Sequence, residues 1–148
     1  MTVQPTTMPA TAMPAKLTGK QIFVNGLIAI VVAVIGNVLV RLILGALVTI
    51  PGDFPPMQLG AIAFFTAFYG VGATAVYWII NRVSSNPQRV WLVVVIIGFV
   101  LTALPDLALA ANPSSAPFPG GTSQLWLLLL VFHLVAGIIY YLLIPRRR

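Results

Sequence analysis

Four long stretches of apolar residues, separated by short polar segments, make up most of the chain. They cover about residues 22–48, 59–81, 90–110 and 124–144. Each reaches the roughly 20 residues that an α-helix needs to cross a hydrocarbon layer about 30 Å thick. Two of the intervening segments, "IPGDFPP" and "NPSSAPFPGG", are rich in Pro and Gly, which end helices. The pattern predicts an all-α membrane protein with four transmembrane helices in an up-down bundle.

The N-terminal segment differs from the rest of the chain. Residues 1–19 begin with "MTVQPTTMPATAMPA", which has no helical periodicity and few large apolar side chains. Such a segment cannot bury enough apolar surface to fold alone, so we expect a flexible tail before a transmembrane domain at residues 20–148. Whether a partner orders this tail stays open. The first apolar stretch is too long for the roughly 7–15-residue core of a cleaved signal peptide, so we expect the mature chain to keep it.

The composition agrees with a membrane protein. Hydrophobic residues make up 59% of the chain and charged residues 7%, whereas soluble domains contain about 25% charged residues. The absence of Cys excludes disulfides, thiolate-held iron–sulfur clusters and covalent haem attachment. The net charge of +6 lies beside the apolar stretches and no nucleic-acid-binding motif accompanies it, so we expect no nucleic-acid partner.

Basic residues predict how the helices are oriented. Seven of the eight fall on one side of the predicted membrane: Lys16, Lys20, Arg82, Arg89, Arg146, Arg147 and Arg148. By the positive-inside rule this side is cytoplasmic. We therefore expect both termini in the cytoplasm, loops 49–58 and 111–123 outside, and a multi-pass protein of the bacterial inner membrane.

Arg41 is the exception, because it lies inside the first apolar stretch. It follows Lys20 by 21 residues, which is roughly 30 Å of helix, so it comes close to the outer surface. There a guanidinium can extend toward water. The two acids of the chain, Asp53 and Asp106, also map to the outer side. Arg41 therefore has two interpretations: its guanidinium extends to water at the outer surface, or it forms a structural ion pair with Asp106 or Asp53.

Helical spacing extends this second interpretation to the neighbouring polar residues. Asn37 lies one turn before Arg41, and Thr102 lies one turn before Asp106. We therefore expect the first and third helices to face each other, with Asn37 near Thr102. Pro105, directly before Asp106, either kinks the third helix beside a small outward cavity or marks where that helix unravels.

His133 is the only histidine and lies about midway along the last apolar stretch. An ionisable group at this depth indicates a proton relay, a hydrogen bond to a quinone or a haem ligand, and a neutral histidine bonded to a neighbouring helix is the plainer alternative. Its depth differs from that of Asp106 by about 10 Å or more, too far for a direct pair. We expect no catalytic residue, metal or cofactor of the chain's own, while contact of His133 with another chain's cofactor stays open.

Small residues predict where helices approach closely. Ala63, Ala67, Gly70 and Thr74 form a stripe at helical spacing on the second helix. Gly98 and Gly137 are assigned the same packing role on the third and fourth helices. The stripe suits either the internal bundle or a second polypeptide, and a homo-oligomer is compatible with it.

The segments "RVWLVVVIIGFVLTALPDLALA" and "LWLLLLVFHLVAGIIYYLLIPRRR" resemble a family of small four-helix bacterial membrane proteins of unknown function. The most specific part is "FHLVAGIIYYLLIPRR", which contains His133, Pro145 and Arg146. Asp106 is not part of the resembled pattern, and the family implies no activity. In size, helix count and tail, the chain also resembles small extra subunits of quinol-oxidising complexes of the alternative complex III type.

These features favour a noncatalytic accessory subunit that packs against larger integral membrane subunits and lipids, for example in a respiratory or photosynthetic electron-transfer complex. An enzyme needs reactive groups within mutual reach, and here they are spread over three helices. A small transporter of protons, ions or small molecules is the alternative, because intramembrane ionisable residues often mark ion paths. The first helix, however, lacks the embedded acid on which four-helix multidrug exporters rely.

Overall fold

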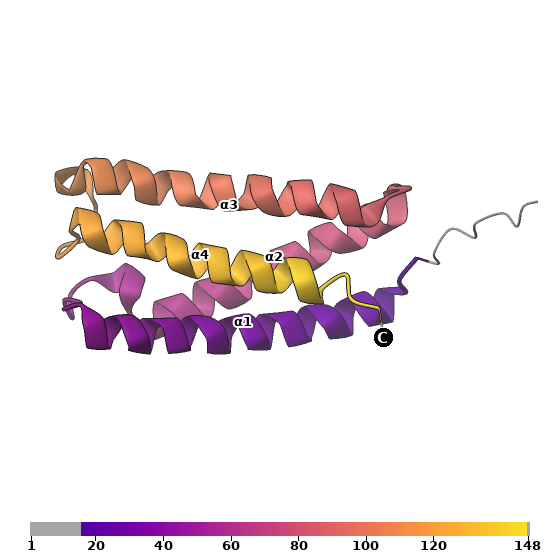
Figure 1. Ribbon diagram of the computed structural model, residues 1–148, viewed down its shortest axis with the longest axis horizontal. Helices are drawn as coiled ribbons and strands as arrows, with labels where there is room; N and C mark the ends of the chain where they lie inside the picture. The colour runs from indigo at the N-terminus through magenta and orange to yellow at the C-terminus, as the bar shows by residue number, and fades with distance from the viewer. Residues whose placement is uncertain (1–15, 148) are drawn as a thin grey trace, which may run out of the picture.

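The computed structural model describes residues 16–147, and this part of the chain is all-helical. Helix α1 spans Gly19–Leu47, α2 Leu59–Val83, α3 Pro87–Ala111 and α4 Ser123–Leu143. Two short 3-10 helices, η1 at Pro55–Met57 and η2 at Pro113–Ser115, lie in the longer loops. All four α-helices are long and apolar enough to cross a membrane, which confirms the predicted membrane-protein class. Figure 1 shows them packed lengthwise in a bundle.

Capping residues explain why α1 and α3 begin three residues before their apolar stretches. Thr18 accepts a hydrogen bond from the backbone N–H of Gln21, whose side chain accepts one from the backbone N–H of Thr18. This capping box starts α1 at Gly19 rather than at residue 22. Asn86 caps α3 in a similar way, and Pro87 suits the first helical position. Hydropathy misses these polar first turns.

The helices pack unevenly around the bundle. α1 packs against α2 and α4, and α3 packs against α4, whereas α2 and α3 touch little. In Figure 1, α4 lies between α3 and α1. The prediction that the first and third helices face each other is therefore wrong. The main neighbour of α3 is α4, and the side between α2 and α3 is open.

Two asparagines join helix ends where the described chain begins and ends. Asn25 of α1 donates from Nδ2 to the carbonyl oxygens of Ile144, at 3.1 Å, and Arg146, at 2.6 Å. Asn81 of α2 donates to the carbonyl oxygen of Leu17, at 2.8 Å. Both asparagines are buried. The start of α1 and the ends of α2 and α4 are therefore held together at one end of the bundle.

The residues directly before α1 belong to this packed end. Leu17 is buried, and Lys16 Nζ donates to the carbonyl oxygen of Arg82 at 2.8 Å. The predicted tail at 1–19 therefore extends too far, because residues 16–19 contact the bundle. The rest of the predicted tail, residues 1–15, lies outside the described residues.

Two members of the predicted small-residue stripe let α1 and α2 approach closely. A Cβ atom added at Gly70 would lie 2.5 Å from Cγ1 of Ile30 and 2.9 Å from the Tyr140 hydroxyl. A Cβ atom added at Gly26 would overlap the side chain of Thr74. At this point the stripe serves the internal bundle, and its other members, Ala63 and Ala67, are half-buried.

The packing role expected for Gly98 is wrong. Gly98 is exposed, and no atom lies within 4 Å of the position that its Cβ would take. At Gly137 the nearest atom to such a Cβ is Cγ1 of Val95, at 3.9 Å. Gly98 has no helix opposite it, because α3 approaches α2 only weakly.

Replacing Gly70 by Ala should lower the free energy of unfolding by about 1–3 kcal/mol, because the new methyl overlaps packed atoms. Gly72 is the matched control on the same helix, since nothing lies within 4 Å of its Cβ position. Gly72→Ala should leave stability unchanged or raise it by up to about 1 kcal/mol, because Gly is a poor helix former. Denaturant titration in mixed micelles, followed by circular dichroism, measures both. An equal decrease in the free energy of unfolding for Gly70→Ala and Gly72→Ala would contradict the close packing at Gly70.

Candidate functional site

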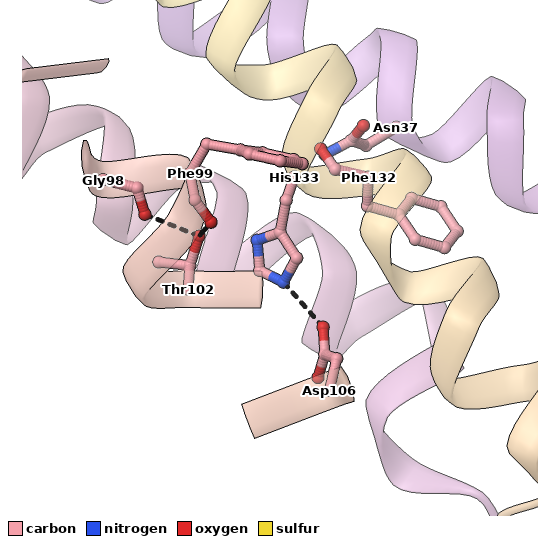
Figure 2. A network of polar contacts seen from close by, with 7 residues as sticks. All are labelled: Asn37, Gly98, Phe99, Thr102, Asp106, Phe132 and His133. Atoms are coloured by element: carbon pink, nitrogen blue, oxygen red, sulfur yellow. Dashed lines mark hydrogen bonds and ion pairs between the residues drawn. The ribbon is translucent and has the colours of Figure 1, made fainter. Parts of the chain in front are cut away.

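The candidate site is a pair formed by His133 of α4 and Asp106 of α3. His133 Nε2 lies 3.0 Å from Asp106 Oδ2, as Figure 2 shows. The His133 side chain is 26% exposed and the Asp106 side chain 12%. Within residues 16–147 this is the one contact between a basic or histidine side chain and a carboxylate.

The prediction that depth separates His133 from Asp106 is wrong, and side-chain direction explains why. A helical side chain leans toward the N-terminus of its own helix. α3 and α4 lie side by side and run in opposite directions in Figure 1. The two side chains therefore lean toward each other. An estimate of depth from backbone rise alone omits this approach.

Asp106 is held inside a continuous helix. α3 continues through Pro105 to Ala111, so it does not unravel at the proline. Thr102 Oγ1 lies 2.9 Å from the carbonyl oxygen of Gly98 and 3.1 Å from that of Phe99. Figure 2 shows these contacts one turn before Asp106. The Thr102 hydroxyl is thus satisfied within α3 rather than by Asn37.

Asn37 is the polar centre of the packing among α1, α2 and α4. Its Nδ2 donates to Thr66 Oγ1, at 2.9 Å, and to the carbonyl oxygen of Phe132, at 3.3 Å. Tyr140 donates from its hydroxyl to the carbonyl oxygen of Thr66, at 2.5 Å. Asn37 is 1% exposed. The predicted contact with Thr102 is wrong, because α2 and α4, not α3, flank α1.

Arg41 pairs with a carbonyl rather than with an acid. Its Nε donates to the carbonyl oxygen of Met57, at 2.6 Å. The predicted ion pair is therefore wrong: Asp106 pairs with His133, and Asp53 is exposed in the loop between α1 and α2. The carbonyl comes within reach because that loop folds back onto the bundle, with Phe54 and Met57 fully buried. Arg41 thus secures the loop to α1.

A groove of about 640 Å³ runs between α2 and α3 and includes the His133–Asp106 pair in its walls. Its lining is mostly apolar, with aromatic side chains such as Phe65, Phe99 and Trp126. Small-molecule sites have volumes of roughly 300–1,000 Å³ and a similar mixture of apolar walls and a few polar groups. The groove exists because α2 and α3 pack so weakly.

The pair can hold a proton or orient a polar ligand. When Asp106 accepts the Nε2–H of a neutral His133, Nδ1 remains an acceptor, and in the imidazolium form both nitrogens donate. Among the described residues, no group of three or more His, Cys, Asp or Glu could hold a metal ion. Sequence reasoning missed the His133–Asp106 pair, and it missed Thr66 and Tyr140 in the hydrogen bonds around Asn37. The opposed lean of side chains on antiparallel helices was the signal that could have found the pair.

A sequence model of a protein family matches residues 14–148, which include all four helices. Its description is a family of unknown function, DUF6069. The chain belongs to the DUF6069 family. This agrees with the resemblance to small membrane proteins of unknown function. No curated protein and no solved structure matches this DUF6069 chain, so its function has to be argued from the site itself.

Removing either partner of the His133–Asp106 pair should destabilise the bundle, because it leaves a polar group without its hydrogen bond. We expect Asp106→Leu and His133→Leu each to lower the free energy of unfolding, with a coupling energy of about 0.6–1.5 kcal/mol in a double-mutant cycle. Thermal or denaturant unfolding in detergent gives the free energies of unfolding of the wild type, the two single variants and the double variant. Asp53→Asn, in the exposed loop, should change little. Strictly additive effects of the two Leu substitutions would show that the pair contributes nothing.

Proposed function

We propose that this DUF6069 protein is a noncatalytic accessory subunit that packs against larger integral membrane subunits. The observation that carries the proposal is the open side of the bundle between α2 and α3. A cluster of exposed aromatic side chains on α2 reaches this opening through Phe65 and Tyr69, which line the groove. The cluster consists of Phe64, Phe65, Phe68 and Tyr69, which are 63%, 53%, 61% and 47% exposed. Aromatic residues are enriched in protein interfaces, so we place the partner on this side.

The aromatic cluster is organised before any partner binds. Ring centroids lie 5.3 Å apart for Phe64 and Phe65, 6.2 Å for Phe64 and Phe68, and 5.7 Å for Phe68 and Tyr69. These separations fall in the range of favourable aromatic pairs, roughly 4.5–7 Å. Side chains that hold one another lose less conformational entropy on binding. The cluster therefore suits a partner helix better than separate phenylalanines would.

The proposal includes an up-down orientation in a bacterial inner membrane, with both termini cytoplasmic. Lys16, Arg82 and Arg146 support it, because hydrogen bonds gather them at the same end of the bundle. The positive-inside rule assigns this end to the cytoplasm. The resemblance to small subunits of quinol-oxidising complexes suggests a respiratory or photosynthetic electron-transfer complex as the assembly.

Mild solubilisation of the tagged chain tests the subunit role. We expect larger membrane subunits to co-purify in fixed stoichiometry with the wild type. Phe65→Ala combined with Tyr69→Ala should release them, because it removes the two exposed rings that line the opening. Phe23→Ala is the matched control, since Phe23 is 68% exposed but lies on α1. Circular dichroism checks that each variant remains folded.

Two outcomes would count against this role. A wild-type chain that purifies alone, as a monomer or homodimer, would contradict the accessory function. Partners that remain bound to the double variant but dissociate from the Phe23→Ala variant would contradict the assignment of the interface to the side between α2 and α3.

A small transporter of protons, ions or small molecules is the second candidate, and the His133–Asp106 pair favours it. The pair lies on the wall of a groove within the apolar length of the bundle. Intramembrane ionisable residues often mark such pathways. Purification of the chain without partners would shift the balance toward this candidate.

A further inference from the structure

The groove between α2 and α3 has the composition of a site for a lipid-soluble molecule. Most of its lining is apolar, and the acidic and basic side chains in it are Asp106 and His133. It opens along the apolar length of the helices, at the weakly packed side of the bundle. A ligand would therefore enter from the lipid phase rather than from water.

The hydrogen-bonding capacity of His133 describes the polar end of such a ligand. Nε2 is engaged with Asp106, and Figure 2 shows the other ring nitrogen directed away from Asp106. When His133 is neutral and Nε2–H is donated to the Asp106 carboxylate, Nδ1 accepts from a hydroxyl, and in the imidazolium form it donates to a carbonyl oxygen. A ring bearing a phenolic or quinone oxygen suits both states. A cation suits neither, because Asp106 already has a partner and no second acid lines the groove.

The shape of the groove describes the rest of the ligand. On α3 the lining extends from Asp106 back to Trp91, a separation of 15 residues, or about 22 Å of helix. The walls carry aromatic rings, including those of Phe65, Phe99 and Trp126, that can pack against a planar ring. Gly72 and Gly98 keep the groove open, because no atom lies within 4 Å of their Cβ positions. An apolar tail fits along this length.

We propose that this groove binds a lipid-soluble ring compound that carries a phenolic or quinone oxygen at one end and an apolar tail at the other. The oxygen bonds to Nδ1 of His133, and the tail lies toward Trp91. Asp106 acts as a positioning residue, because it holds the imidazole in place through Nε2. The proposal concerns the chain alone and does not depend on the subunit role, since a partner across the opening would cover the ligand rather than supply its contacts.

Binding of a decyl-substituted benzoquinone to the full-length chain in lipid nanodiscs tests this site. Quenching of tryptophan fluorescence reports binding, because Trp91 and Trp126 line the groove. We expect saturable quenching of the wild type. His133→Phe should weaken binding about fivefold to tenfold, as expected for the loss of one hydrogen bond. Gly98→Leu should weaken it more than tenfold, because the side chain fills the groove.

The matched control for Gly98→Leu is Gly60→Leu. Gly60 also has open space at its Cβ position, but it lies outside the groove, so its substitution should leave binding unchanged. Circular dichroism establishes whether each variant is folded. If His133→Phe does not fold, Gly98→Leu alone decides the test. Decanol, which has a similar tail and a hydroxyl but no ring, is the comparison probe and should compete poorly.

Three results would overturn the proposal. Wild-type quenching that does not saturate would show that there is no site. Equal affinity of the wild type and Gly98→Leu would place the quinone elsewhere in the nanodisc or protein. Competition by decanol as strong as that of the quinone would assign the groove to an acyl chain. Each result is obtained without any partner subunit, so it leaves the accessory role to its own test.

Discussion

The arrangement of this bundle depends on a few hydrogen bonds between helices that are otherwise apolar. In a hydrocarbon environment apolar surface does not select one neighbour over another, so packing of small residues and polar contacts carry the specificity. Asn37 bonds to α2 through Thr66 and to α4 through the carbonyl of Phe132, and Tyr140 bonds back to the carbonyl of Thr66. These bonds make α2 and α4 the neighbours of α1. The remaining helix, α3, is left to pack on α4, where Asp106 meets His133.

One consequence is that the bundle is closed on three sides and open on the fourth. The weak packing of α2 on α3 creates the groove, exposes the Gly72 and Gly98 backbone along it and keeps His133 half-buried. The same opening carries both proposals, because a larger subunit can cover it and a small lipid-soluble ring compound can lie within it. The His133–Asp106 pair gives the opening chemical character that a purely structural helix pair would lack.

The sequence predicts the helices well and their neighbours poorly. Runs of apolar residues locate α1 to α4 to within three residues, because crossing a membrane imposes a minimum length. Equal depth of Arg41 and Asp106 suggested an ion pair, but depth carries no information about which helices touch. Arg41 instead finds the carbonyl of Met57 in a loop whose fold the apolar pattern does not describe. The approach of His133 to Asp106 follows from side-chain lean once α3 and α4 are known to be antiparallel neighbours, and residue spacing alone lacks that fact.

Cysteine cross-linking in native membranes tests the helix order most directly, since the chain contains no cysteine of its own. A Cβ atom at Gly36 of α1 would lie 3.4 Å from Cγ1 of Val135 on α4. The structure therefore predicts rapid disulfide formation in the Gly36→Cys, Val135→Cys variant. The Gly36→Cys, Thr102→Cys variant, which joins α1 to α3, should not cross-link within one chain. Efficient cross-linking of the second pair and none of the first would contradict the neighbour order on which the site and both proposals depend.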